Sequence, residues 1–101
     1  MSKQYAFSPT ANNVALSASA SSANGTLPGT TVDGDCIRIH NNSGAIAYVR
    51  WSPTASPVAV TTDTFLAAGA TEVFQSPGAL YVAAILASGT GTVYFQRGVG
   101  L

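Results

Sequence analysis

The stretch CIRIHNNSGAIAYVRW, residues 36–51, shows apolar and polar side chains alternating on both sides of a central Asn-Asn-Ser-Gly. A period of two is typical of a β-strand with one face toward a core. Asn and Gly tolerate the positive φ angles of a tight turn. The stretch therefore predicts two antiparallel strands joined as a hairpin, with the aliphatic side chains and Trp51 facing the core.

The same alternation places polar and aromatic side chains together on the outer face of this predicted hairpin. These are Arg38, His40, Tyr48 and Arg50. Arg and Tyr are enriched at binding hot spots, so the four residues are candidates for a partner-binding patch that grips carboxylates. The alternative is a pair of solvated arginines beside Tyr48, with a cation–π contact between them and the ring.

Short strands separated by Gly, Pro and Asn turns follow along the rest of the chain. They are expected at residues 13–18, 58–60, 79–86 and 92–97, and as a second hairpin within residues 64–74. The run 79–86 is apolar throughout, which indicates a strand buried on both faces, although periodicity alone also allows a buried helical turn. Strands spaced by about 8–12 residues, without an amphipathic helix, predict an all-β antiparallel β-sandwich or jelly roll of about seven or eight short strands.

The length of 101 residues fits a single domain. We expect the β-sandwich domain to occupy residues 11–101 and residues 1–10 to form an N-terminal arm or edge strand, because Pro9 cannot donate to a sheet ladder. If the arm adds to a neighbouring subunit, Tyr5 and Phe7 are its expected anchors. The alternative is an edge strand or a frayed terminus.

Charged residues make up only 8% of the chain, and the formal net charge is zero. Globular domains average about 25%, and depletion of charge is a property of interface cores, so much of this surface is expected to contact other protein subunits. The alternative is a soluble domain with a hydroxyl-rich surface. The charge balance indicates neither nucleic acid nor an anionic membrane as a partner. No apolar run reaches the roughly 18–20 residues of a membrane span, and no secretion signal is evident.

Groups for catalysis or metal binding are few: one His, one Cys and four carboxylates. Cys36 and His40 share a predicted strand face, but at about 3.3 Å per residue their backbones lie roughly 13 Å apart, too far for a thiolate–imidazole pair. Two potential ligands without a third make a poor zinc site, and the chain has no phosphate-binding glycine loop. We therefore expect a protein without catalytic residues, metal or cofactor.

Two blocks carry a resemblance to a known class of protein: the strand, Asn-Asn-Ser-Gly turn and Ala-Tyr-Val-Arg-Trp of residues 36–51, and the Ala-x-Gly-Thr-Gly-Thr-Val-Tyr of residues 87–94. The chain is similar over most of residues 11–101 to small virion structural proteins of tailed bacteriophages, including capsid decoration (cement) proteins. This resemblance implies a β-sandwich or jelly roll without catalysis, located in the virion after synthesis in the host cytoplasm. It also implies a homo-oligomer, a trimer being favoured, that binds the major capsid protein or other virion proteins. It supplies no functional residues, so the site prediction rests on the hairpin and the arm.

Two other functions stay open on the sequence. One is another virion component, such as a tail, collar or fibre-base module. The other is a small carbohydrate-binding β-sandwich, in which Trp51, Tyr48 or Tyr81 would stack on sugar rings. An exposed Trp51 would favour the carbohydrate-binding function, whereas the predicted strand buries it.

Overall fold

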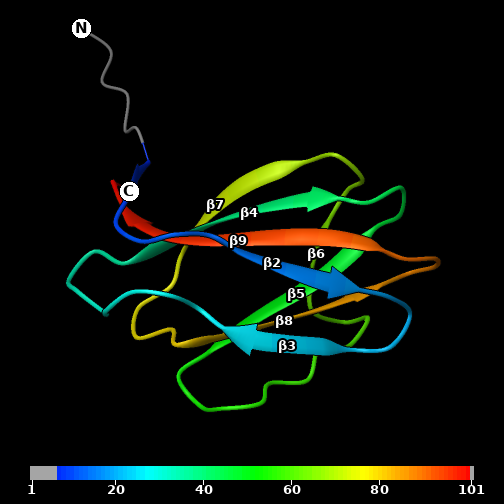
Figure 1. The fold of residues 1–101 in the computed structure, drawn as a ribbon, viewed down its shortest axis with the longest axis horizontal. Coiled ribbons are helices and arrows are strands. Elements are labelled where there is room, and N and C mark those ends of the chain that lie inside the picture. The colour runs from blue at the N-terminus through cyan, green and yellow to red at the C-terminus, as the bar shows by residue number, and fades with distance from the viewer. Residues whose placement is uncertain (1–6, 101) are drawn as a thin grey trace, which may run out of the picture.

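The computed structural model describes residues 7–100, which form two antiparallel sheets packed face to face (Figure 1). The first sheet contains β1 (Ser8–Pro9), β2 (Val14–Ala18), β4 (Cys36–Asn42), β7 (Thr71–Gln75) and β9 (Gly91–Val99). The second sheet contains β3 (Ala23–Thr26), β5 (Ala47–Ser52), β6 (Thr64–Leu66) and β8 (Tyr81–Leu86). Within the described residues, no helix is long and apolar enough to cross a membrane.

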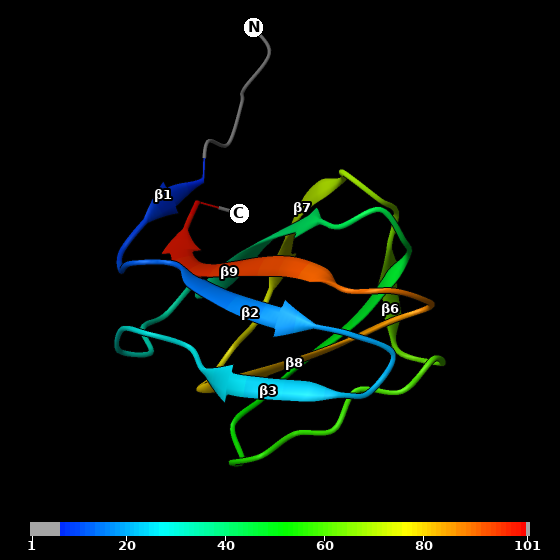
Figure 2. The same cartoon turned by 45° about the vertical axis from the view of Figure 1, so that its right-hand side comes forward.

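The order of the strands is that of a jelly roll. In the first sheet β2 and β1 both pair with one edge of β9, and β4 and then β7 follow on its other side. The second sheet has the order β3-β8-β5-β6. The chain therefore changes sheet at every connection from β2 to β9 except the one between β5 and β6, as can be followed in the rotated view of Figure 2. The predicted all-β sandwich is confirmed, with nine strands among the described residues.

Both predicted hairpins are wrong. β4 pairs with β7 and β9, whereas β5 pairs with β6 and β8 in the other sheet, so residues 43–46 cross the sandwich instead of turning back. Residues 67–70, between β6 and β7, make a second crossing beside the first. Alternation predicts which side of a strand faces the core, but a strand that returns in the facing sheet satisfies the same pattern.

The buried side chain of Asn41 explains why the Asn-Asn-Ser-Gly segment crosses between the sheets. Its Nδ2 donates hydrogen bonds to the carbonyl oxygens of Ala45, Leu66 and Ala67, at 2.8, 2.9 and 3.2 Å. Its Oδ1 accepts a hydrogen bond from the Ser43 hydroxyl at 2.6 Å. One fully buried amide thus satisfies backbone groups of both crossings, which would otherwise be costly to bury.

Three short segments differ from the expected strands. β3 forms in a stretch expected to be a connection, because its residues pair with the buried strand β8 despite their Asn and Gly content. Residues 58–60 are not part of either sheet. β1 pairs with Gly98 and Val99 at the open edge of β9, where proline is tolerated. The described residues include Phe7, whereas Tyr5 lies outside them.

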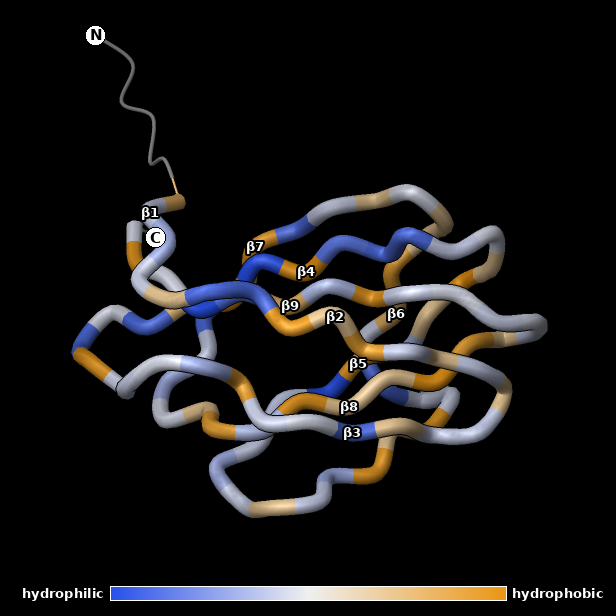
Figure 3. The backbone as a smooth tube through the Cα atoms, viewed as in Figure 1, coloured by the Kyte–Doolittle hydropathy of each residue, from blue (hydrophilic) through white to orange (hydrophobic). Residues whose placement is uncertain are grey.

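The core lies between the two sheets and consists of the inward-facing aliphatic side chains of both. Figure 3 shows the hydrophobic residues spaced along the strands of each sheet. The fully buried members of the core include Ile37, Ile39, Val49, Leu66, Val82, Val93 and Phe95. Trp51 of β5 extends this core by packing on Phe74 of β7, with ring centroids 5.0 Å apart. Each large side chain removed from water in this way contributes roughly 1.5–3 kcal/mol.

A buried ion pair fixes the loops beside β9. Arg97 Nη1 lies 2.7 Å from Asp35 Oδ2, and both side chains are fully buried. The same guanidinium donates to the carbonyl oxygens of Pro28 and Ala79, at 3.2 and 2.6 Å. One side chain therefore holds the loop between β3 and β4 at two points and the loop between β7 and β8 at one, and the charge of Arg97 is neutralised inside the protein.

Candidate functional site

The four candidates of the predicted patch do not lie together. Arg38 and His40 project from β4 on the outer face of the first sheet, whereas Tyr48 and Arg50 project from β5 on the outer face of the second. These faces are on opposite sides of the sandwich (Figure 1). The prediction of one patch is therefore wrong, because it depended on a hairpin that does not form.

The outer face of the second sheet carries an exposed apolar row. Tyr48 of β5 lies opposite Phe65 of β6 on one side and opposite Ile85 of β8 on the other. Phe65 is 64% exposed, and the other two are half-buried. Ile46, which precedes β5, is also 41% exposed. We call Phe65, Tyr48 and Ile85 the apolar row.

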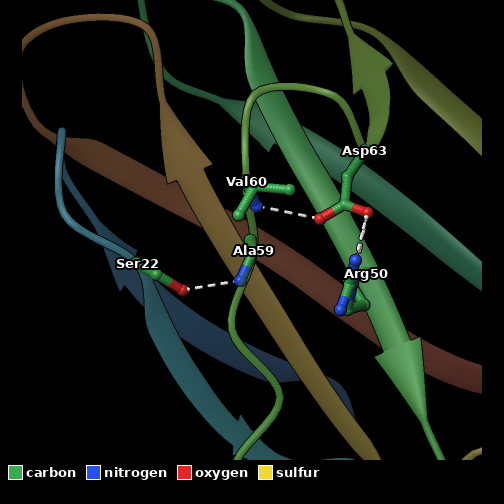
Figure 4. A network of polar contacts seen from close by, with 5 residues as sticks. All are labelled: Ser22, Arg50, Ala59, Val60 and Asp63. Carbon is green, nitrogen blue, oxygen red and sulfur yellow. Dashed lines mark hydrogen bonds and ion pairs between the residues drawn. The ribbon is translucent and has the colours of Figure 1, made fainter.

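A strap formed by residues 57–60 borders the apolar row. The backbone N–H of Ala59 donates to Ser22 Oγ at 2.8 Å, next to β3, and the N–H of Val60 donates to Asp63 Oδ2 at 2.8 Å (Figure 4). Because β8 lies between β3 and β5, a strap tied on both sides passes across β8. Ala83 on the outer side of β8 is accordingly fully buried.

Arg50 belongs to the support of this strap. Its Nε and Nη2 donate to Asp63 Oδ1 at 3.2 and 2.9 Å, while the other oxygen of Asp63 holds the strap (Figure 4). The carboxylate that Arg50 binds therefore belongs to Asp63 of the same chain. This leaves the second outer face with a neutralised cation beside exposed apolar side chains, among them Val58 at 58% exposure.

The outer face of the first sheet has a shallow hollow of about 300 Å³. We call it the basin. Side chains from four segments line it: Asn13, Arg38, His40, Thr71, Tyr94 and Gln96. The registers of β4 with β9 and β7 bring these residues together, because Arg38 lies opposite Gln96, and His40 lies opposite both Tyr94 and Thr71.

Arg38 is held at the rim of the basin by two contacts that leave its charge intact. Its Nη2 donates to Gln96 Oε1 at 2.5 Å, and its guanidinium carbon lies 4.7 Å from the centroid of the Phe7 ring. Gln96 is itself oriented, because its Nε2 donates to the Ala11 carbonyl oxygen at 2.9 Å. Phe7 rests against Gly98, where any Cβ would collide with the ring. The contact partner of Phe7 is therefore Arg38 of the same chain.

His40 lies deeper in the basin and is half-buried. Its Nδ1 is 2.6 Å from Thr71 Oγ1, and its ring lies beside that of Tyr94, with centroids 6.3 Å apart and planes at 29°. Both rings line the basin, together with the hydrogen-bonding side chains of Thr71 and Asn13.

The charge of the basin is unbalanced. Among residues 7–100, Arg50 and Arg97 each form an ion pair with an aspartate, and Arg38 forms none. None of the residues lining the basin is a carboxylate. Cys36 lies at the other end of β4, where its side chain is buried and its Sγ is 3.4 Å from the Gly98 carbonyl oxygen. Within the described residues, no group of three or more His, Cys, Asp or Glu side chains could hold a metal.

Sequence reasoning missed most residues of both surfaces. The alternation within residues 92–97 places Tyr94 and Gln96 on one strand face, but it does not show that this face continues that of Arg38 and His40. The contacts join residues that are far apart in the chain: Arg38 and Gln96 are separated by 58 positions, and His40 and Thr71 by 31. Comparison of the chain with family models, curated protein sequences and solved structures gives no match.

Proposed function

We propose that the protein is a structural virion protein of the capsid decoration type, which binds a capsid lattice through the apolar row. The observation that carries the proposal is the exposure of Phe65, which is 64% exposed and lies beside Tyr48 and Ile85. The core residues between the two sheets, in contrast, are buried. Exposed apolar side chains gathered on one sheet face mark an interaction surface when polar residues border them.

The electrostatics of this face favour docking on protein. Asp63 already neutralises Arg50, so a partner that covers the face does not leave an unpaired charge in the interface. The cores of interfaces are depleted in charge and enriched in aromatic side chains, which matches Phe65 and Tyr48. Many such weak contacts on one lattice give strong overall binding through avidity.

The jelly-roll fold agrees with this function without specifying it. Jelly rolls form viral capsid domains as well as lectins, and a fold by itself does not determine function. The major capsid protein is the partner that we propose, with a homotrimer as the binding form. A tail, collar or fibre-base location would use the same apolar row, and only binding to isolated virion parts separates these alternatives.

The carbohydrate-binding alternative loses its main stacking residue. Trp51 is half-buried and packs on Phe74 instead of standing free on a surface. A sugar ring therefore cannot use Trp51 as an open platform in this structure. Tyr48 is part of the apolar row, and Tyr81 is half-buried at the start of β8.

Co-sedimentation with capsids tests the proposal. The purified protein is mixed with capsids, and separately with tails, of the phage whose genome carries its coding sequence, and the particles are pelleted. We expect saturable binding to capsids, and at least about a tenfold weaker affinity for Phe65→Ala, because aromatic anchors dominate interface energies. Val32→Ala is the matched control, since Val32 is 52% exposed in a loop outside both sheets. Absence of the protein from capsid pellets, or unchanged binding of Phe65→Ala, would contradict the proposal. Pelleting with tails alone would show that the protein belongs to another part of the virion.

A further inference from the structure

The basin on the first sheet is on the side of the molecule opposite to the apolar row, so its role is independent of the proposed docking face. If the apolar row is covered by a lattice, the basin faces away from that lattice. Its residues must therefore be explained by something other than the capsid contact.

The state of Arg38 is the first observation. Arg38 is exposed, and its guanidinium contacts both Gln96 and the ring of Phe7. Neither contact is anionic, so the full positive charge is offered to solvent in one orientation. Ordering a charged side chain costs conformational entropy. Because this side chain is already ordered in the folded protein, the free energy of ligand binding does not include that cost.

The rest of the basin limits the chemistry of the ligand. No lining residue carries a negative charge, which favours an anion. A guanidinium binds carboxylates in a planar, directional manner, and Arg38 retains donors that Gln96 does not occupy. A carboxylate near Arg38 fits these donors.

The neighbouring groups indicate what carries that carboxylate. The His40 and Tyr94 rings both line the basin, so the C–H face of another ring can pack against them, and Asn13 and Thr71 supply hydrogen-bonding groups for hydroxyls. A volume of about 300 Å³ is at the lower end of ligand pockets, which suits a single ring. An aspartate or glutamate side chain would use Arg38 and leave both rings without a contact.

We propose that the basin is a binding site for an acidic saccharide, in which Arg38 binds the carboxylate of a pyranose ring that rests on His40 and Tyr94. Gln96 is a positioning residue, because it orients Arg38 and is itself oriented by the Ala11 carbonyl. A virion protein with this site would bind acidic glycans on the surface that it presents to its surroundings.

Titration of the isotopically labelled full chain by NMR tests the assignment. The probes are methyl glucuronide, the neutral methyl glucoside as its matched analogue, and N-acetylglutamate as an acidic side-chain analogue. We expect saturable shifts at residues 38, 40, 94 and 96 with the glucuronide, and at least about tenfold weaker binding of the other two, because each lacks either the charge or the ring.

Two variants test whether the unneutralised charge of Arg38 binds the ligand. Arg38→Gln removes the charge, and Gln96→Glu keeps the guanidinium but places a carboxylate against it. Both are expected to weaken glucuronide binding at least about tenfold. Arg50→Gln on the opposite sheet is the control and is expected to bind as the wild type does.

Three results would overturn the proposal: no saturable shifts with the glucuronide, equal binding of the glucoside or N-acetylglutamate, or unchanged binding in Arg38→Gln. A dispersed spectrum of each variant shows that it is folded. Because Arg38 and Gln96 lie on the sheet opposite to the apolar row, capsid pelleting of Arg38→Gln and Gln96→Glu can succeed when saccharide binding fails. Likewise, Phe65→Ala can lose capsid binding and keep saccharide binding.

Discussion

The three arginines of the chain illustrate how its few charges are used. Arg97 is fully buried against Asp35, Arg50 is paired with Asp63 at the surface, and Arg38 is exposed without an ion pair among the described residues. Position 97 follows Val93 and Phe95 with a period of two, so the alternation of β9 carries this arginine toward the core side. A charge at such a position requires a buried partner, which the sequence could not identify, because Asp35 is 62 residues away.

The two ion pairs predict different sensitivities to the same substitution. Asp35→Asn leaves a buried guanidinium without its counter-charge and is expected to lower the free energy of unfolding by about 3–5 kcal/mol. Asp63→Asn affects a pair whose arginine side chain is 44% exposed, and a loss of no more than about 1 kcal/mol is expected. Urea denaturation of both variants measures this difference, and equal losses would contradict it.

At the scale of the elements, the crossings between sheets define the fold. Segment 41–44 was predicted to be the turn between two strands, whereas β4 continues to Asn42 and the break consists of residues 43–46. The direction of the chain after the break was not predicted correctly. A turn signal is local, whereas the choice between a hairpin and a crossing depends on which surfaces the second strand can bury. Here β5 finds its partners in β6 and β8, and Asn41 satisfies the backbone of the crossings.

Asn41 and Asn42 provide a matched pair of substitutions. Asn41→Ala removes one fully buried amide that donates three hydrogen bonds, and we expect a loss of about 3 kcal/mol in the free energy of unfolding, because orphaned buried polar groups cost roughly 1–3 kcal/mol each. Asn42→Ala changes an exposed neighbour, for which about 0.5 kcal/mol or less is expected. Thermal or urea unfolding distinguishes the two, and a similar effect of both substitutions would show that Asn41 does not support the crossings.

At the scale of the whole molecule, the sandwich presents two chemically different outer faces. The face of the second sheet is apolar with a neutralised cation, and the face of the first sheet carries the unneutralised Arg38. This asymmetry allows one face to dock and the other to bind a ligand. The sheets also have open edges; among residues 7–100, β7, for example, pairs only with β4. Such an edge is available for association with another copy.

The proposed trimer predicts the mass of the protein in solution. Light scattering during size-exclusion chromatography is expected to give a mass close to three times 10.2 kDa, because a charge-poor surface with open strand edges favours self-association. A mass of one chain at every concentration tested would contradict the trimer. It would not affect the capsid-pelleting test, which measures lattice binding directly.

The sequence by itself determined the class of the fold and the inner and outer sides of most strands, since alternation and turn residues are local properties of the chain. Alternation put Ile37, Ile39 and Val49 on the core side and grouped Val93 with Phe95 on one strand face, and all five are buried in the structure. Only the tertiary structure decided which strands are neighbours. Strand pairing depends on which distant segments can form hydrogen bonds with the same sheet edge, and a local pattern does not contain this information. As a result, Arg38 lies beside Gln96 and Phe7, and Arg50 lies beside Asp63 on the opposite face.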